Sequence, residues 1–307
     1  MKSAVAAVLI VLGVVGCTQR QGSDIRSGAL TVLVTESHLP LVQHMAKEYH
    51  EAFPNATIEP RGTTTRAAIV DMANDSVHCI VVDRRLNEEE RAAVESARLR
   101  VVETEIAQDG IAVLVHRGNR LSSMSTEELA AILTGTTGVW NAMPASKLRG
   151  PIELCLTGKN SGLYEMVVRR FFRIQGDVPV AAVAPSQRGI LEYVATHPEA
   201  MGLISYAAWR DTSDPAQERW KKEVQILAFS VKDTQGVMTT VKLNPRNIFD
   251  QYYPLTYSLY IYTSEKMPGT AQGFSAFVAG DRGQRMFQYA GLVPKTMPYR
   301  TIQLTQE

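Results

Sequence analysis

The feature that most constrains the fold is a regular alternation of strand-like and helix-like segments over residues 29–97. Three β-branched or apolar segments predict strands: ALTVLVT (29–35), ATIEP (56–60) and CIVV (79–82). The segments between and after them predict helices: 42–53, which Pro54 stops, 62–70 and 87–97. Ser37 or His38 is the candidate cap of the first helix. Strands and helices in this order predict a parallel α/β unit.

A second unit of the same kind follows Asp109. GIAVLVH (110–116) predicts a long apolar strand, and Ser125 with Glu128 forms a capping-box pattern before a helix that Gly135 ends. Further strands are predicted at 151–156, 201–206 and 257–263, and further helices from Gly162 and over 189–195, 272–278 and 283–289. Residues 210–223 are expected to be a solvated excursion. Two such lobes leave a cleft between them, where ligands bind at the carboxyl ends of strands.

The N-terminus has the features of a secretion signal. Lys2 precedes an apolar run over residues 4–16, which is too short to be a secure membrane span. The run ends at Cys17 in a pattern that resembles a bacterial lipobox, and this resemblance implies that Cys17 is lipidated. Residues 1–16 are therefore expected to be a signal peptide and 17–28 a lipidated N-terminus and linker. The alternative is an uncleaved anchor helix.

Charge and cysteine content exclude several classes of protein. The formal charge is +1, and removing Lys2 with the signal leaves 31 basic against 31 acidic residues. Nucleic-acid binding is not expected, because it needs a basic field. Apart from Cys17, only Cys79 and Cys155 remain; buried free thiols are expected, with a disulfide as the alternative and no catalytic cysteine. About 280 residues remain after the signal, enough for two lobes with separate cores.

The segment TGKNSGL, residues 157–163, is the candidate anion site. Small polar residues there follow a predicted strand and open a predicted helix, whose N-terminal N–H groups and dipole attract anions. The spacing is not that of a phosphate loop or a nucleophile elbow. His44 and Glu48 share a helix face, but two ligands do not make a metal site. No catalytic residue, metal or cofactor is expected.

The order of segments resembles the phosphate-binding proteins of bacterial ABC importers. The matching segments, in order, are RGTTTRAAI, VVDRRL, IAQDGIAVLVHRGN, MSTEELAAILTGTTGVWN, KNSG, MGLISY, YYPLTYSLYIYT and FSAFVAGDRGQRMFQYAGLVP. The resemblance implies an α/β, two-lobed type II periplasmic-binding-protein fold, each lobe a mixed sheet flanked by helices, with two crossover strands. It places lobe 1 at 29–109 plus 258–307 and lobe 2 at 110–257. It also implies a monomer that grips an oxyanion between its lobes.

The resemblance also implies which residues bind the anion. Ser37 matches a family Thr or Ser, and Asp83 matches a family Asp or Ser. A carboxylate there accepts a hydrogen bond from protonated phosphate and repels fully ionised sulfate. The complete expected set is Ser37, Thr63, Thr64, Asp83, Thr157, Lys159, Asn160, Ser161 and Gly162. Each has an ordinary structural alternative, such as capping by the Thr residues or a surface ion pair between Asp83 and Arg84 or Arg85.

Three positions depart from the family pattern. Thr157 and Tyr257 stand where the family has Arg, and Leu163 stands where it has Thr. The guanidinium clamp is therefore missing, although Lys159, Arg66 or Arg84 remain as candidate sources of positive charge, and Glu36 beside Ser37 adds a negative one. These departures predict weaker anion binding or a ligand other than orthophosphate. Restoring Arg at position 157 should tighten phosphate binding if only the clamp is missing.

Two functions remain open. The first is a lipid-anchored extracytoplasmic (periplasmic) receptor in the cell envelope that captures phosphate or a related oxyanion for an ABC permease. The second is a diverged homologue that lost transport and acts as a sensor or partner-binding module, because a fold does not fix a function.

Overall fold

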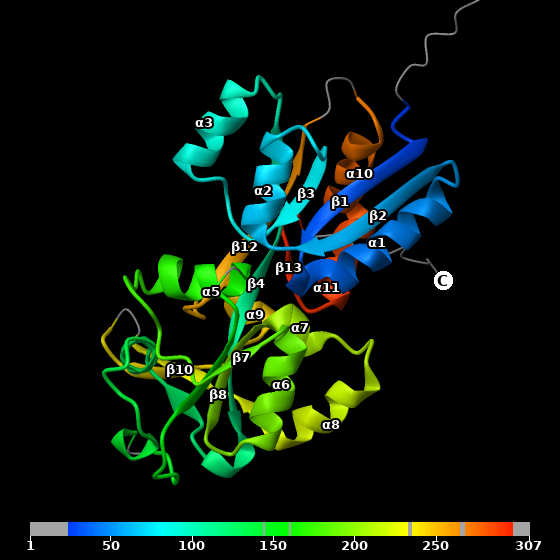
Figure 1. Ribbon diagram of the computed structural model, residues 1–307. Coiled ribbons are helices and arrows are strands. Elements are labelled where there is room, and N and C mark those ends of the chain that lie inside the picture. The colour runs from blue at the N-terminus through cyan, green and yellow to red at the C-terminus, as the bar shows by residue number, and fades with distance from the viewer. Residues whose placement is uncertain (1–23, 144, 160, 233–234, 265–267, 297–307) are drawn as a thin grey trace, which may run out of the picture.

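The computed structural model describes residues 24–143, 145–159, 161–232, 235–264 and 268–296. The expected signal peptide and Cys17 lie outside these residues. The described chain forms two bodies, one above the other in Figure 1, which we call the upper and lower lobes. None of the helices described is long and apolar enough to cross a membrane.

The upper lobe contains a mixed sheet with helices on both faces (Figure 1). Its strands are β1 (Gly28–Thr35), β2 (Ala56–Thr63), β3 (Cys79–Val82) and β12 (Thr256–Thr263). Its helices are α1 (Leu39–Ala52), α2 (Thr65–Ala73), α3 (Glu88–Ser96), α10 (Thr270–Ala279) and α11 (Asp281–Tyr289). Strand β1 is parallel to β2 and β3, as the alternating pattern predicts, whereas β12 is antiparallel to β3. The three parallel strands therefore end at one edge of the sheet, where a short 3-10 turn (Glu36–His38) follows β1.

Both faces of this sheet are buried. On one face, Tyr49 of α1 packs against Phe274 and Phe277 of α10, with ring centroids 5.5 and 5.3 Å apart. On the other face, Ile69 and Met72 of α2 belong to a separate buried cluster with residues of β3 and β12. This two-sided burial explains why the CIVV strand is apolar at every position.

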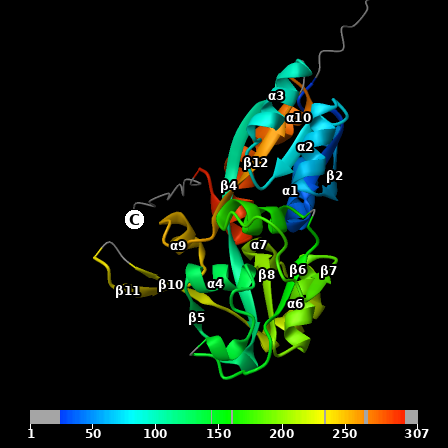
Figure 2. The same cartoon turned by 60° about the vertical axis from the view of Figure 1, so that its left-hand side comes forward.

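One long strand joins the lobes. Strand β4 (Val102–His116) pairs with β12 over residues 102–110 and with β8 over 111–115, and Figure 2 shows it running from the upper into the lower lobe. The predicted apolar strand 110–116 is confirmed, but β4 begins earlier, where polar residues such as Glu103 and Gln108 hide the strand pattern. The prediction of two crossover strands is wrong in one respect. Within the described parts of the chain, strand β12 pairs with β3 and with residues 102–110 of β4 and with no strand of the lower lobe, and residues 250–255, which lead back to it, form no strand.

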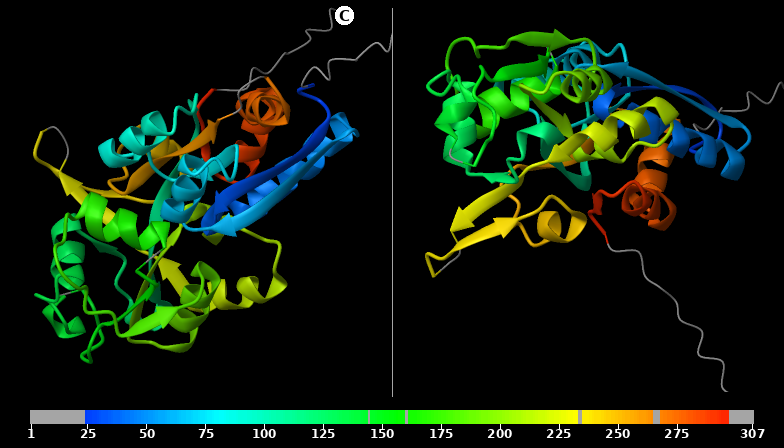
Figure 3. Two further views of the ribbon diagram at one scale, coloured as in Figure 1. Left: turned by 45° about the horizontal axis from the view of Figure 1, so that its top comes forward. Right: turned by 90° about the horizontal axis from the view of Figure 1, so that it is seen from below.

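The lower lobe continues the same sheet through β4. Its principal strands are β6 (Glu153–Thr157), β7 (Ala182–Ala184) and β8 (Ala200–Ser205), and β9 (Val224–Ile226) also pairs with β4. The C-terminal strand β13 (Val293–Pro294) pairs with Ala107 and Gln108, in the part of β4 that lies beside β12. Strands β8, β6 and β7 are parallel to one another and β8 is antiparallel to β4, so this part of the sheet is also mixed. A small separate sheet contains β5 (Ser123–Met124), β10 (Ala228–Lys232) and β11 (Met238–Val241). Figure 3 shows the last two projecting from the body of the lobe.

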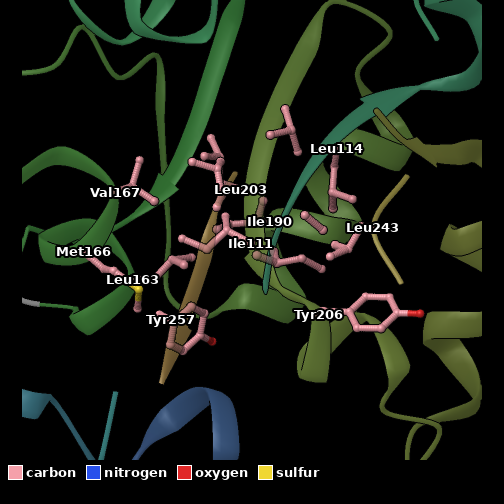
Figure 4. Packing of buried hydrophobic residues seen from close by; sticks show 14 of the residues in the cluster. Ile111, Leu114, Leu163, Met166, Val167, Ile190, Leu203, Tyr206, Leu243 and Tyr257 are labelled. Carbon is pink, nitrogen blue, oxygen red and sulfur yellow. The ribbon is translucent and has the colours of Figure 1, made fainter. Parts of the chain in front are cut away.

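The helices of the lower lobe cover this sheet. They are α4 (Thr126–Leu133), α5 (Gly162–Tyr164), a π-helix (Glu165–Phe171), α6 (Gln187–Thr196), α7 (Tyr206–Arg210), α8 (Pro215–Glu223) and α9 (Pro245–Phe249), with 3-10 turns at Arg117–Asn119 and Trp140–Ala142. In Figure 4, Ile111 and Leu114 of β4 lie among Ile190 of α6, Leu203 of β8 and Leu243. Residues 210–223, expected to be a solvated excursion, are mostly exposed or half-buried, but they contain the regular helix α8, which Asp214 caps, and Trp220 packs against the core.

Candidate functional site

The chain turns that follow five strands meet between the lobes in one small cavity, which we call the cradle. Its upper wall contains Thr35, Glu36 and Ser37 at the end of β1, Thr63 and Thr64 at the end of β2, and Asp83 after β3. Its lower wall contains Thr157, which ends β6, then Ser161, Gly162 and Leu163, and Gln187 after β7. The cradle has a volume of only about 10 Å³. That is room for about one water molecule.

Asp83 is the buried acid of the cradle. Its side chain is 3% exposed, and its Oδ1 accepts a 2.6 Å hydrogen bond from the Thr65 hydroxyl. The alternative of a surface ion pair with Arg84 or Arg85 is therefore wrong. A buried carboxylate with one satisfied oxygen has remaining capacity to accept a proton donor from a ligand.

Thr157 and Ser161 close the lower wall. Their hydroxyl oxygens lie 2.5 Å apart, and Ser161 Oγ also accepts the Tyr164 N–H at 3.1 Å, which caps α5. Thr157, for which the sequence resemblance implies an Arg in the family, is 5% exposed. None of the described residues that line the cradle is a Lys or Arg, whereas Glu36 and Asp83 are acidic. The cradle as it stands offers hydroxyl groups and carboxylates but no guanidinium clamp.

The two lobes touch directly at the cradle. A Cβ atom at Gly162 would lie 2.5 Å from Asp83 Oδ2 and 2.9 Å from the Thr65 hydroxyl oxygen, so only Gly fits there with the lobes this close. Gln187 makes the second contact. Its amide nitrogen donates to the Ser37 hydroxyl across the cleft, and its amide oxygen accepts the Ser205 N–H at 2.7 Å.

Gln187 is a cradle residue that the sequence analysis missed. The available signal was its place at the start of a helix that follows a short strand, the same arrangement that led to Ser37 and Ser161. The strand itself, AVA at β7, is too short for its pattern to be recognised.

The candidate cations lie outside the cradle. Lys159 is 63% exposed and donates to Asp177 at 2.5 Å, and this hydrogen bond raises the pKa of its amine. The guanidinium of Arg84 donates two hydrogen bonds to the carboxylate of Glu90, at 2.7 and 2.9 Å. Its Nε lies 3.2 Å from Glu165 Oε1 on the other lobe, but the geometry is not that of a hydrogen bond. Burial alone would lower the pKa of Arg84, but the bond to Glu90 and the charge of Glu165 raise it. Asn160 and Cys17 lie outside the described residues.

Directly beneath the cradle, a buried polar cluster lies where β4 passes between the lobes. Asp109 Oδ2 accepts a hydrogen bond from the Tyr257 hydroxyl at 2.9 Å and lies 3.1 Å from His38 Nε2. The side chains of Asp109 and His38 are at most 1% exposed. The predicted cap of α1 is wrong. His38 occupies the N-cap position of α1, but neither its side chain nor that of Ser37 accepts a capping hydrogen bond from the first turn of the helix. Burial, followed by the charge of Asp109, raises the pKa of Tyr257 well above its ordinary value. Its hydroxyl therefore stays protonated and acts as a donor.

Other side-chain predictions concern thiols and metals. Cys79 and Cys155 are both buried, as expected. Burial raises the pKa of the Cys155 thiol to about 11. Within the described part of the chain, no group of three or more His, Cys, Asp or Glu side chains is placed to hold a metal ion.

The sequence and the fold both match known proteins. The family model of the PBP superfamily domain matches residues 19–282. The phosphate-binding protein PstS of Staphylococcus saprophyticus is 22% identical over 249 residues, covering 80% of this chain and 74% of that protein. Protein SphX of Synechococcus elongatus is 21% identical over 298 residues, covering 94% and 85%.

Two solved structures show the same fold. A chain from Clostridium perfringens, described as a phosphate ABC transporter substrate-binding protein with bound phosphate, superposes with a TM-score of 0.72 at 19% identity, covering 88% of this chain and 100% of that chain. An ABC-type phosphate transport receptor from Vibrio cholerae gives 0.66 at 18% identity, covering 87% and 100%. At these identities the structures establish the mixed α/β architecture of phosphate-binding proteins and leave the ligand open.

Proposed function

The chain belongs to the PBP superfamily, and from this premise we propose that it captures phosphate or a related oxyanion between its lobes for an ABC importer. The family consists of substrate-binding proteins rather than enzymes, in agreement with the expected lack of catalytic residues. We place lobe 1 at 29–109 plus 258–307 and lobe 2 at 110–257. The exchange of β4 partners from β12 to β8 between Gly110 and Ile111 supports this division.

The observation that carries the proposal is the convergence of the cradle residues from both lobes. The hydroxyl-bearing residues Ser37, Thr63, Thr64, Thr157 and Ser161 line one cavity together with the buried residue Asp83. Hydroxyl donors suit an oxyanion, and the carboxylate selects one that still carries a proton. Closure of the lobes on such a ligand would present one shape to a permease, provided the ligand binds the closed state better than the open one.

The remaining parts of the proposal concern location and assembly. We propose an extracytoplasmic lipoprotein in the cell envelope, periplasmic where that compartment exists, held to the membrane by the lipid on Cys17 and acting as a monomer. The apolar run over residues 4–16 and the cysteine that follows it support this location.

The absence of a cation from the described lining of the cradle favours a second candidate. A homologue that kept the fold but no longer transports an oxyanion would serve as a sensor or as a binding module for another ligand or protein. Oxyanion affinity separates the two functions.

A thermal-shift titration tests the proposal. The full chain, purified in mild detergent and freed of phosphate, is titrated with phosphate, sulfate, phosphonates and nitrate. A specific ligand at 100 times its dissociation constant stabilises the folded protein by about 2.7 kcal/mol, which gives a clear rise in Tm. A rise with a protonatable oxyanion and none with sulfate or nitrate is the expected result. No rise with any oxyanion would refute the proposal in favour of the second candidate.

The variant Asp83→Asn tests the selectivity of the cradle. It keeps the acceptor for the Thr65 hydroxyl but removes the negative charge, so sulfate binding should improve relative to phosphate. Glu95→Gln is the control, since it removes one carboxylate charge at an exposed position of α3 outside the cradle. If the ratio of sulfate affinity to phosphate affinity is unchanged in Asp83→Asn, Asp83 does not determine the selectivity of the cradle.

A further inference from the structure

A larger groove adjoins the cradle at Thr64, which lines both cavities. The groove has a volume of about 680 Å³ and lies between α2 of the upper lobe and the segment from Lys159 to Arg169 of the lower lobe. This volume is within the range of sites for small organic ligands, whereas the cradle holds about one water. Figure 1 shows α2 in the upper lobe and α5 at the top of the lower lobe.

The groove has positively charged side chains on both walls. Arg66 lies on one wall, and Lys159 and Arg169 lie on the other, but Lys159 is paired with Asp177. The two carboxylates of the lining are Asp71 and Glu165, and Glu165 shares the guanidinium of Arg84 with Glu90. No acidic partner within ion-pair distance is found for Arg66 or Arg169 among the described residues. Arg169 donates one of its N–H groups to the Ile174 carbonyl, so its other N–H groups and the guanidinium of Arg66 are the donors left for a ligand.

One buried side chain in the groove lacks a hydrogen-bond partner. Tyr164, which lines the groove, is 4% exposed, and its hydroxyl bonds to no described residue. Tyr164 also lies near Lys159, because it adds to the rise in the pKa of that amine after the larger effect of Asp177. A buried hydroxyl that bonds to nothing in the protein costs stability, and a bound ligand would satisfy it.

The groove also has an apolar side. Ala67 and Val70 of α2 line it, and Val70 is 49% exposed. Orthophosphate has no group that would use such a surface, but an organic substituent would be partly removed from water there.

We propose that the groove binds a phosphate monoester or phosphonate, with its anionic group held by Arg66 and Arg169 and its organic group against Val70 and Tyr164. This inference rests on the proposed function and names its substrate class. It accounts for the loss of the clamp at Thr157, since the charge that the cradle lacks lies next to it in the groove. Thr64 stands between the two cavities, so that one ligand can contact both.

Calorimetric titration of the full chain in detergent with orthophosphate, methyl phosphate and phenyl phosphate tests the proposal. Phenyl phosphate should bind at least about tenfold more tightly than orthophosphate, since only the ester uses the apolar wall. Arg66→Gln and Arg169→Gln should each weaken phenyl phosphate binding about tenfold, the effect of losing one charge-assisted hydrogen bond. Arg100→Gln, an exposed upper-lobe arginine outside the groove, should leave it unchanged.

Tyr164→Phe distinguishes a ligand role from a structural one. Removing an unpartnered hydroxyl should leave the thermal stability unchanged or higher, while phenyl phosphate affinity falls. The groove proposal is refuted if orthophosphate and phenyl phosphate bind with equal affinity, or if the Arg66 and Arg169 variants bind phenyl phosphate as the wild type does. Neither result would refute the proposal that the protein captures an oxyanion. Failure of every phosphate compound to bind would overturn both.

Discussion

At the scale of single residues, Gly162 decides how closely the lobes approach. Its backbone is helical, so alanine suits the local conformation, but the added Cβ would lie 2.5 Å from Asp83 Oδ2. Both that carboxylate and the Thr65 hydroxyl beside it are buried and bonded to each other. Neither can move aside without losing its partner, so the lobes must separate instead.

We therefore predict that Gly162→Ala shifts the protein toward an open form. Small-angle scattering should show a larger radius of gyration than for the wild type, with little change in thermal stability. Gly158→Ala is a matched control four residues earlier, since the nearest neighbour of its Cβ would be 4.0 Å away. Scattering of Gly162→Ala that superimposes on the wild type would show that the contact with Asp83 does not set the approach of the lobes.

At the scale of elements, the sequence predicted most of the parallel strands and their helices. The segments with a regular period, such as β1 and α4, follow the prediction, and the capping box of Ser125 and Glu128 is confirmed at 2.7 and 3.1 Å. The cradle residues could be predicted because they follow these strands directly. Gln187 could not, because β7 has only three residues.

The errors have identifiable physical causes. The first half of β4 lies beside β12 with polar residues on its surface, so tertiary pairing rather than pattern makes it a strand. The segment after Gly162 was predicted as a helix, and the structure shows one α-helical turn followed by a π-helix, Glu165–Phe171. A short apolar pattern cannot distinguish these two helical periods. The positions of Lys159 and Arg84 depend on Asp177 and Glu90, and sequence spacing does not reveal such partners.

Strand β6 leads to a prediction about thiol reactivity. Burial raises the pKa of Cys155 to about 11, so at pH 8 only about one thiol in a thousand is the reactive thiolate. Iodoacetamide at pH 8 should therefore leave Cys155 unmodified in the folded protein and modify it fully in urea. Peptide mass mapping reads this site separately from the other cysteines. Rapid labelling of Cys155 without denaturant would mean that β6 is not buried in solution.

At the scale of the whole molecule, the connection between the lobes depends on one buried acid, Asp109, at the point where β4 crosses from one lobe to the other. Asp109 lies in β4 just before its partner changes from β12 to β8. It accepts the Tyr257 hydroxyl, the Gly110 N–H at 2.7 Å and the Ala207 N–H at 3.3 Å, and it lies beside His38. These partners come from both lobes, so the Asp109 cluster couples their positions. The sequence resemblance implies an Arg at the position of Tyr257 in the family, so on that correspondence a neutral donor takes the place of a cation.

This arrangement predicts that Tyr257→Phe destabilises the whole molecule. The Tyr257 pKa is raised by burial and by Asp109, so the hydroxyl is a donor to the carboxylate at every ordinary pH, and its loss leaves a buried charge with one bond fewer. We expect the free energy of unfolding in urea to fall by about 1.5–3 kcal/mol, the range for hydrogen bonds to charged groups. Tyr253→Phe is the matched control. Tyr253 is equally buried but donates to the neutral Ile111 carbonyl at 2.7 Å, so its loss should cost about 1 kcal/mol. If the two variants lose the same stability, the charge of Asp109 does not hold the lobes together. The coupling between the lobes must then come from the packing around β4.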